Sequence, residues 1–99
     1  MSEIQVVYWR DIPAQVKARD GRERAARALE PRFQEAVDAA AMRAGLTETD
    51  EYLAEWRASE WEERPGTPKQ IADERAAEIE AEYSAARLRS LVDNGGREG

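Results

Sequence analysis

The sequence predicts a single α+β domain in which a small antiparallel sheet is packed by helices. Three features indicate this fold: an N-terminal run of β-branched and aromatic residues, a two-residue turn signal after it, and later segments with helix-capping residues and helical apolar spacing. The predicted strands are about residues 3–10, 14–19 and 22–29, and the predicted helices are about residues 31–44, 48–59 and 68–93. A length of 99 residues suits one domain, expected over residues 1–93, with a disordered tail at 94–99.

The first strand is predicted from the run EIQVVYWR at residues 3–10. Such residues favour strands, and both alternating faces of this run are largely apolar. A strand that is apolar on both faces is typical of the centre of a sheet. Pro13 restricts Ile12 to an extended conformation, so we expect the strand to end before it.

Residues 14–29 have two interpretations. Asp20-Gly21 is a strong signal for a hairpin with a type I′ turn, which would pair 14–19 with the segment after the turn. The alternative is a helix from Gly21, because RERAARALE is rich in helix formers. Pro31 would then have to kink or end that helix within ten residues. We favour the hairpin.

The first two helices are predicted from their capping residues. Pro31 suits a first helical position and Gly45 suits the residue after a helix, which gives 31–44. The next helix is expected from about residue 48, because the residues that begin at Thr47 resemble a capping box. It should end near Ser59. Its buried face is expected to consist of Tyr52, Leu53 and Trp56.

The last helix follows a charged loop at residues 60–66, which carries Trp61. Thr67 is a suitable N-cap with proline after it, so one continuous helix is predicted over 68–93. Exposed tryptophans in loops are enriched in binding surfaces, which makes Trp61 a candidate contact residue. The alternative is that Trp61 folds back over the small core.

The composition excludes several classes of active site. The chain has no cysteine and no histidine, which removes thiolate nucleophiles, imidazole bases and the commonest transition-metal ligands. We therefore expect no intrinsic enzymatic activity, no metal site and no cofactor. No signal-peptide pattern and no apolar run of about 20 residues is present, so we expect no membrane span and a cytoplasmic location.

The net charge of −6 is unevenly distributed. Residues 1–45 carry eight Lys and Arg against seven Asp and Glu, whereas residues 46–99 carry seven against fourteen. An acidic second half disfavours nucleic acid as a partner, because the phosphate backbone requires a basic surface. The acidic residues of the last helix are interpreted as a solvated face.

The predicted hairpin is the exception to this acidic character. A turn at Asp20-Gly21 would place Arg19 opposite Arg22 and Lys17 opposite Arg24, with Gln15 beside them. Like charges directly across a strand pair destabilise it, so an anion or an acidic partner would relieve the repulsion. The alternative is that the chain's own acidic helix neutralises these cations, or that water simply solvates their long side chains.

Three segments resemble a known family: YWRDIPAQV (8–16), RFQEAVDAAAMRAGL (32–46) and YLAEWR (52–57). The chain is similar over about residues 4–92 to the bacterial "virulence factor" domain, which is also one module of the larger conserved virulence factor C proteins. The resemblance implies no reaction. It implies a shared surface whose candidate residues are Tyr8, Trp9, Arg10, Asp11, Gln15, Met42 and Arg43.

The leading hypothesis is a non-catalytic binding or accessory domain that docks on a larger protein partner. The resemblance implies an alternative, because stand-alone relatives accompany folate and corrinoid one-carbon metabolism: an accessory subunit that binds a small anionic ligand through the basic hairpin. A third hypothesis, a regulator that binds nucleic acid through the same hairpin, is disfavoured by the net charge.

Overall fold

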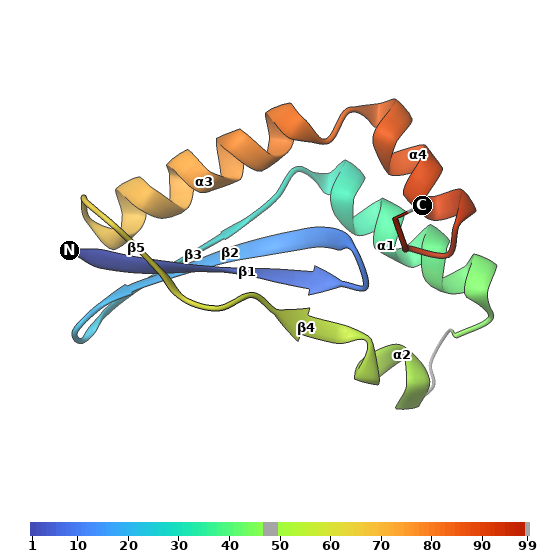
Figure 1. The fold of residues 1–99 in the computed structure, drawn as a ribbon, viewed down its shortest axis with the longest axis horizontal. Coiled ribbons are helices and arrows are strands. Elements are labelled where there is room, and N and C mark those ends of the chain that lie inside the picture. Colours follow the sequence, from blue (N-terminus) through green and yellow to red (C-terminus); the bar gives the residue numbers. More distant parts are fainter. Residues whose placement is uncertain (47–49, 99) are drawn as a thin grey trace.

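A computed structural model describes residues 1–46 and 50–98 of the chain (Figure 1). In chain order, the elements are β1 (Ser2–Trp9), β2 (Ile12–Asp20), β3 (Glu23–Ala28), α1 (Pro31–Ala44), α2 (Asp50–Ala54), β4 (Trp56–Ala58), β5 (Glu62–Arg64), α3 (Pro68–Glu82) and α4 (Ala85–Asp93). The α+β class is confirmed. The described residues form five strands and four helices, where three of each were expected.

Every strand pairing in the described sheet is antiparallel, and β1 lies at its centre. The strand order is β3-β2-β1-β4, and β5 pairs with the N-terminal end of β1. One edge of β1 therefore pairs with β2, and the other pairs with β4 and β5. The central position predicted from the two apolar faces of this strand is confirmed.

The hairpin interpretation of residues 14–29 is confirmed, and the alternative helix is wrong. Its register, however, differs by one residue from the prediction: Asp20 lies opposite Glu23, so the turn is Gly21-Arg22. Gly21 has φ +59°, and Arg22 has no positive φ. A type II′ turn requires one glycine, at its first central position, whereas the predicted type I′ turn would also force Asp20 to positive φ.

Pro13 does not end the strand region as expected, because it lies within β2 opposite Tyr8. The β1–β2 register shifts at this point, since Val7 lies opposite Gln15. At this end of the sheet β3 has already stopped, as its last residue, Ala28, pairs with Gln15. No third described strand lies beside Pro13, so its missing N–H does not cost a hydrogen bond to such a strand.

The helix predicted over 48–59 is wrong in its second half. The described part of it is helical only at Asp50–Ala54, and Trp56–Ala58 forms β4; its predicted start at 48 lies outside the described residues. The open edge of β1 accepts this segment as a strand, and Trp56 pairs with Trp9. Residues 62–64, expected to be loop, pair with the other end of the same edge. Pairing with β1 therefore overrides local helix propensity.

The long helix predicted over 68–93 is two helices. The predicted start is confirmed, because Thr67 accepts a hydrogen bond from the Gln70 amide and the Gln70 side chain accepts one from the Thr67 amide. The chain then breaks at Tyr83, with φ −102° and ψ 87°, and Ser84 caps α4. The buried ring of Tyr83 packs edge-on against Phe33, with centroids 6.1 Å apart, and Figure 1 shows α4 lying along α1 after the break.

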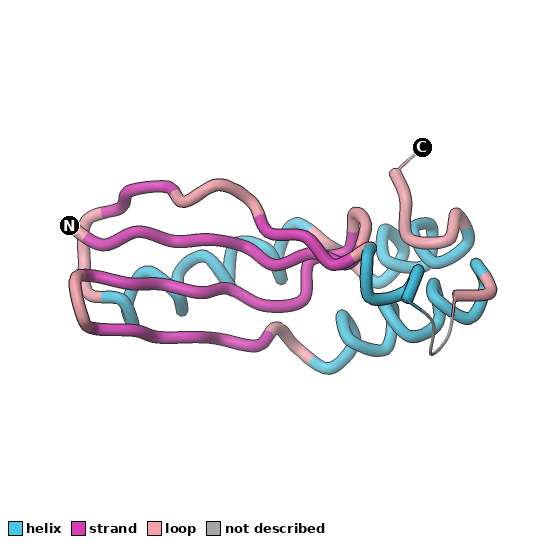
Figure 2. The backbone as a smooth tube through the Cα atoms, turned by 90° about the horizontal axis from the view of Figure 1, so that it is seen from below, coloured by secondary structure: helices cyan, strands magenta, loops and turns pink. Residues whose placement is uncertain are grey.

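The helices leave one face of the sheet uncovered. Apolar residues of β1 and β2, with Ile4 and Val16 among them, are buried on the side of α3, which buries Ile71 and Ile79 in return. The helices α1 and α4 lie beyond one end of the strands, and Figure 2 views the sheet from its opposite face, with α3 behind it. Among the described residues, no helix has the length and apolar character needed to cross a membrane.

The ion pair between Glu78 on α3 and Arg64 on β5 predicts a pH-dependent stability. Two hydrogen bonds from Arg64, at 2.9 and 3.0 Å, hold the pKa of Glu78 below its ordinary value. A carboxylate with a lowered folded-state pKa stabilises the fold above its unfolded-state pKa of about 4.3 and loses this effect as the pH falls through the folded-state value.

We therefore expect Glu78→Gln to lower the free energy of unfolding at neutral pH by less than about 1 kcal/mol, because both partners reach solvent. The difference from wild type should shrink as the pH falls below about 4.3 and Glu78 becomes protonated in the folded state. Urea unfolding at neutral pH and across this acid range measures it. The control is Glu82→Gln, since Glu82 makes no side-chain ion pair with a described residue. An effect of Glu78→Gln that persists at low pH would contradict the ion-pair explanation.

Candidate binding site on the open sheet face

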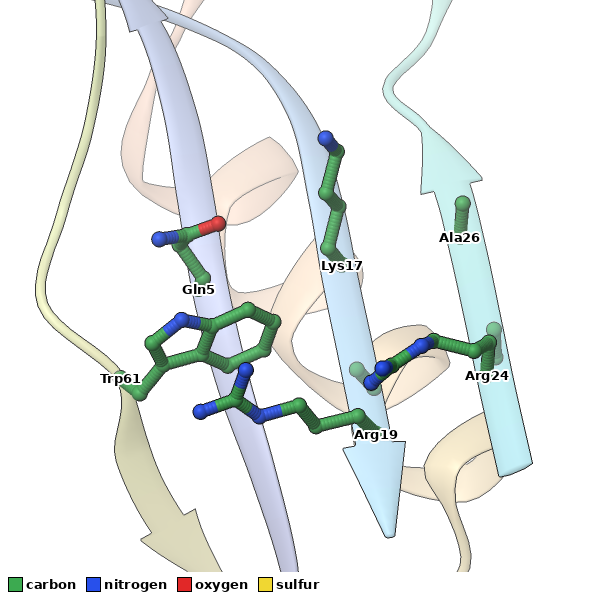
Figure 3. A pocket seen from close by; sticks show the side chains of 8 residues that line it. Gln5, Lys17, Arg19, Arg24, Ala26 and Trp61 are labelled. Atoms are coloured by element: carbon green, nitrogen blue, oxygen red, sulfur yellow. The ribbon is translucent and has the colours of Figure 1, made fainter. Parts of the chain in front are cut away.

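The face of the sheet opposite α3 carries the candidate site, which we call the open face and define as Gln5, Lys17, Arg19, Arg24, Ala26 and Trp61 (Figure 3). Strand register brings these residues together: Gln5 lies opposite Lys17, Lys17 opposite Ala26, and Arg19 opposite Arg24. They line a hollow of about 500 Å³. The small side chain of Ala26 leaves space beside Lys17 and Arg24 (Figure 3).

Trp61 forms the aromatic wall of the hollow. Because β5 pairs with the N-terminal end of β1, with Glu62 opposite Ile4, the preceding Trp61 comes to lie beside β1. Its ring extends across to β2, where the Arg19 guanidinium lies 3.8 Å from the ring centroid (Figure 3). Arg19 also donates to Glu3 at 3.0 Å. Trp61 is thus half-buried against the sheet, and does not fold into the core.

Three further cations of the hairpin, Lys17, Arg22 and Arg24, make no ion pair with any described residue. Ten of the fifteen lysines and arginines pair with an acidic side chain among the described residues. The five that do not are Lys17, Arg22, Arg24, Arg43 and Arg89. Three of these five lie on one hairpin, so unpaired positive charge is concentrated there although the chain as a whole is acidic.

The acidic helix does not neutralise this cluster, so the intramolecular alternative is wrong for Lys17, Arg22 and Arg24. The helix α3 covers the other face of the sheet, where Asp73 and Glu80 pair with Arg27 at 3.1 and 3.9 Å. Asp20 and Glu23, which alternate with Arg19 and Arg24, belong to that same face. The hairpin thus carries Lys17, Arg19 and Arg24 on the open face, whereas Arg27 and the two acidic residues of the hairpin lie on the face of α3.

The open face therefore offers two kinds of contact. Lys17 and Arg24 supply exposed positive charge, and Arg19 presents its remaining N–H groups while its planar face stacks on Trp61. Guanidinium and ammonium groups beside an aromatic ring suit carboxylates or phosphates. Within the described residues, no group of three or more acidic side chains is placed to hold a metal ion.

A comparison with protein-family models matches residues 7–92 to the family described as "Virulence factor". The chain belongs to the virulence factor family. No curated protein and no solved structure gives a significant match to it. The family assignment associates this domain with virulence and names no reaction.

The first motif of this virulence factor domain lies at the turn between β1 and β2, which we call the corner and define as Trp9, Arg10 and Asp11. Trp9 has no exposed surface and donates from its indole nitrogen to the carbonyl of Tyr52 at 3.0 Å. Arg10 adopts φ +52° and donates to the Gly95 carbonyl, and Asp11 accepts a bond from Arg57. Buried Trp9 cannot contact a partner in this conformation, so its predicted place in a shared surface is wrong.

The C-terminal residues were expected to be disordered, but residues 94–98 lie against this corner. The Asp11 amide donates to the Gly96 carbonyl at 2.8 Å, and the Glu98 amide donates to the Asp11 carboxylate at 2.7 Å. Gly96 passes so close to Trp9 that a side chain would not fit between them. These hydrogen bonds explain why a glycine-rich end is held in place; Gly99 lies outside the described residues.

The remaining candidates lie apart from the hollow. Tyr8 is half-buried at the end of β1 with Arg57 stacked on its ring, at 4.5 Å from the centroid. Gln15 lies further along β2, and Arg22 lies in the hairpin turn. Met42 and Arg43 are exposed on the last turn of α1, where Met42 is 70 % accessible. Whether any of these residues binds a partner stays a prediction.

Sequence reasoning missed two residues of the open face, Gln5 and Ala26. Both are identified by pairing alone, since each lies directly opposite Lys17 on a neighbouring strand. The correct register was needed to place them, because a shift of one residue moves a side chain to the other face of the sheet. The alternation within EIQVVYWR did place Gln5 away from the apolar face of Ile4 and Val6.

The close approach of Gly96 to Trp9 predicts how the corner contributes to stability. An added Cβ at Gly96 would lie 2.8 Å from Cζ3 of Trp9, and φ there is +95°. Gly45 provides a matched control, because its φ is +72° but no atom lies within 4 Å of an added Cβ.

We expect Gly45→Ala to lower the free energy of unfolding by about 1 kcal/mol through backbone strain alone. Gly96→Ala should lower it by about 1–3 kcal/mol more, because the buried ring has to move. Urea unfolding followed by tryptophan fluorescence measures both. Equal losses would show that the contact with Trp9 does not stabilise the corner.

Proposed function

We propose that this virulence factor domain is a non-catalytic binding module that docks on a larger protein partner through the open face. The strongest support comes from three residues that line the same hollow, on a face that no described helix covers. Lys17 and Arg24 make no ion pair with a described residue, and Trp61 is half-exposed beside them. Aromatic residues and arginine are the residue types most enriched at the energetic centres of protein interfaces.

The charge of the open face favours an acidic partner. Arg24 lies directly opposite Arg19, and like charges in this position repel. Glu3 pairs with Arg19 only, so a carboxylate of the partner placed at Arg24 would reduce the remaining repulsion. Residues 46–99 carry a net charge of −7. The basic hairpin is therefore a local feature, suited to orienting a partner, on an otherwise acidic chain.

The non-catalytic part of the proposal rests on chemistry that the chain lacks. General bases near neutral pH are most often histidines, and strong nucleophiles are often cysteines; this sequence contains neither. The carboxylates whose pKa is shifted, Asp73 and Glu78, are shifted downward by ion partners, which keeps them ionised. Neither of them lines the hollow.

A charge-matched pair of double variants tests the docking proposal. Lys17→Gln with Arg24→Gln removes two unpaired cations from the open face, and Lys69→Gln with Arg89→Gln removes two exposed cations from α3 and α4, which carry no candidate binding residue. Both change the net charge equally. Because Lys17 and Arg24 make no ion pair within the described structure and Arg24 repels Arg19, the first variant should keep or slightly raise the wild-type melting temperature.

Immobilised wild type, the open-face variant and the control are incubated with the same lysate of the source organism. We expect proteins that both wild type and the control retain to be reduced about tenfold or more on the open-face variant, as removal of two contacting charges predicts. Their retention should also weaken as salt rises. Equal retention by all three proteins would overturn the proposed docking surface.

A small anionic ligand in the same hollow is the second candidate, as an accessory function in folate or corrinoid one-carbon metabolism. The hollow of about 500 Å³ has the size of a small-molecule site, and it combines an aromatic wall with two free cations. Folic acid carries a planar ring system and two carboxylates, which makes it a suitable probe.

This candidate predicts saturable binding of folic acid to the wild type, measured by titration calorimetry. Trp61→Phe should bind about as well, because a ring is retained, whereas Trp61→Ala and the open-face double variant should each bind at least about tenfold more weakly. Absence of binding to the wild type at millimolar folic acid would reject the small-ligand candidate and leave the docking proposal standing.

A further inference from the structure

The strand β3 has an unpaired outer edge beside the open face. It pairs with β2 along its whole length and has no described strand on its other side, and Figure 2 shows it as the outermost strand of the sheet. Such an edge presents a row of backbone N–H and C=O groups to any extended chain that reaches it.

The hairpin register shows which backbone groups face outward. The Leu29 amide donates to the Ala14 carbonyl at 3.2 Å. In an antiparallel pair, residues directed toward the partner strand alternate with residues directed away from it. Glu23, Ala25 and Arg27 therefore bond to β2. The outward groups belong to Arg24, Ala26 and Ala28, whose side chains lie on the open face.

The edge lacks several of the features that usually protect an edge strand against an added strand. Its sequence, ERAARA, contains no proline and no lysine, and its pairing with β2 is regular, without a bulge. Arg27 does not guard the edge, because its guanidinium is held on the opposite face by Asp73 and Glu80. Ala26 and Ala28 are small and exposed, so they leave room for side chains of a neighbouring strand.

The charges beside the edge select what can pair with it. Arg24 lies on β3 itself, and Lys17 lies one strand further in, separated from the edge only by Ala26. A new strand would lie about 4.8 Å beyond β3, so a glutamate opposite Ala26 could extend over that methyl group toward Lys17. A second copy of this chain would instead bring its own unpaired cations to the edge.

We propose that β3 binds an extended acidic segment of the partner by strand addition, with alternate carboxylates directed to Arg24 and Lys17. This inference rests on the proposed docking function and specifies its partner: main-chain hydrogen bonds to Arg24, Ala26 and Ala28 provide the pairing, and the cations of the open face provide the selectivity. A contact between the peptide and Trp61 is not needed for strand addition to β3.

Synthetic peptides of six residues test the proposal on the intact chain. One set carries glutamate at alternate positions with valine, threonine or tyrosine between them, and a second set carries glutamine in place of glutamate. A third set keeps the glutamates but has N-methylated amides at every second residue, which removes the strand-pairing donors. Binding is followed by NMR, together with hydrogen exchange of the β3 amides.

We expect members of the glutamate set to bind and to slow the exchange of the Arg24, Ala26 and Ala28 amides. The glutamine set should bind about tenfold more weakly, because the two charge pairs with Arg24 and Lys17 are lost. The N-methylated set should not protect these amides. Failure of every glutamate peptide to protect them at millimolar concentration would overturn the proposal.

Ala26→Pro provides a matched variant of the protein. Its amide faces outward, so proline removes a donor to the added strand without removing a hydrogen bond to β2. The variant should retain the far-ultraviolet circular dichroism of the wild type and lose peptide binding. Should it fail to fold, the N-methylated peptides make the same test on the unchanged protein.

The remaining outcomes separate this inference from the docking function on which it rests. Equal binding of N-methylated and unmodified glutamate peptides would show a charged surface without strand addition, which overturns the inference and leaves docking intact. Protection of the β3 amides by self-association, detected by sedimentation without peptide, would identify a second copy as the occupant and also overturn it. Loss of lysate docking in the control variant would instead reject the docking proposal.

Discussion

The pairing of β1 along both of its edges is the constraint on which this structure depends. One edge joins β2, which immediately follows it in the chain, and the other joins β4 and β5, which come some fifty residues later. Its buried side packs beneath α3. Among the described strands, β1 and β2 have partners on both edges, but only β1 joins the β2–β3 hairpin to β4 and β5. Loss of β1 would therefore separate the hairpin from the second half of the chain.

The candidate site is a direct consequence of this arrangement. Trp61 and Arg19 are 42 positions apart in the chain, and they stack because β5 and β2 lie on the two sides of β1. The far end of β1 has a different role. There Trp9 is enclosed by Tyr52 and the C-terminal residues, so the most distinctive family motif stabilises the fold at a distance from the open face.

Charge is organised by the two faces of the sheet. The acidic helix α3 neutralises Arg27 and Arg64, which lie where it packs, and it lies on the opposite side from Lys17 and Arg24. A chain with a net charge of −6 thus keeps an unneutralised basic surface, because the acidic helix α3 covers only the other face of the sheet. Such a surface can select acidic partners without making the whole chain attractive to polyanions.

Local signals in the sequence determined several elements of this virulence factor domain. The helix at 31–44 is bounded by Pro31 and Gly45 as expected, the Thr67 cap begins α3, and the apolar faces of residues 3–10 identified the central strand. These features depend on residues within a few positions of one another, through proline and glycine conformation, capping hydrogen bonds and the alternation of side chains along a strand. The basic hairpin and Trp61 were also recognised from sequence, as two separate surfaces.

Only the tertiary structure decided how these parts combine. Residues 56–58 and 62–64 are strands because β1 offers an unpaired edge, and Tyr83 ends α3 because its ring is buried against Phe33. The turn at Gly21-Arg22 places Arg24, rather than Arg22, beside Arg19. The strands at 56–58 and 62–64 and the break at Tyr83 depend on partners distant in sequence, whose free energy of pairing or burial exceeds the local preference of a few residues. The turn depends on the register of the whole hairpin, which the Asp20-Gly21 signal alone did not determine.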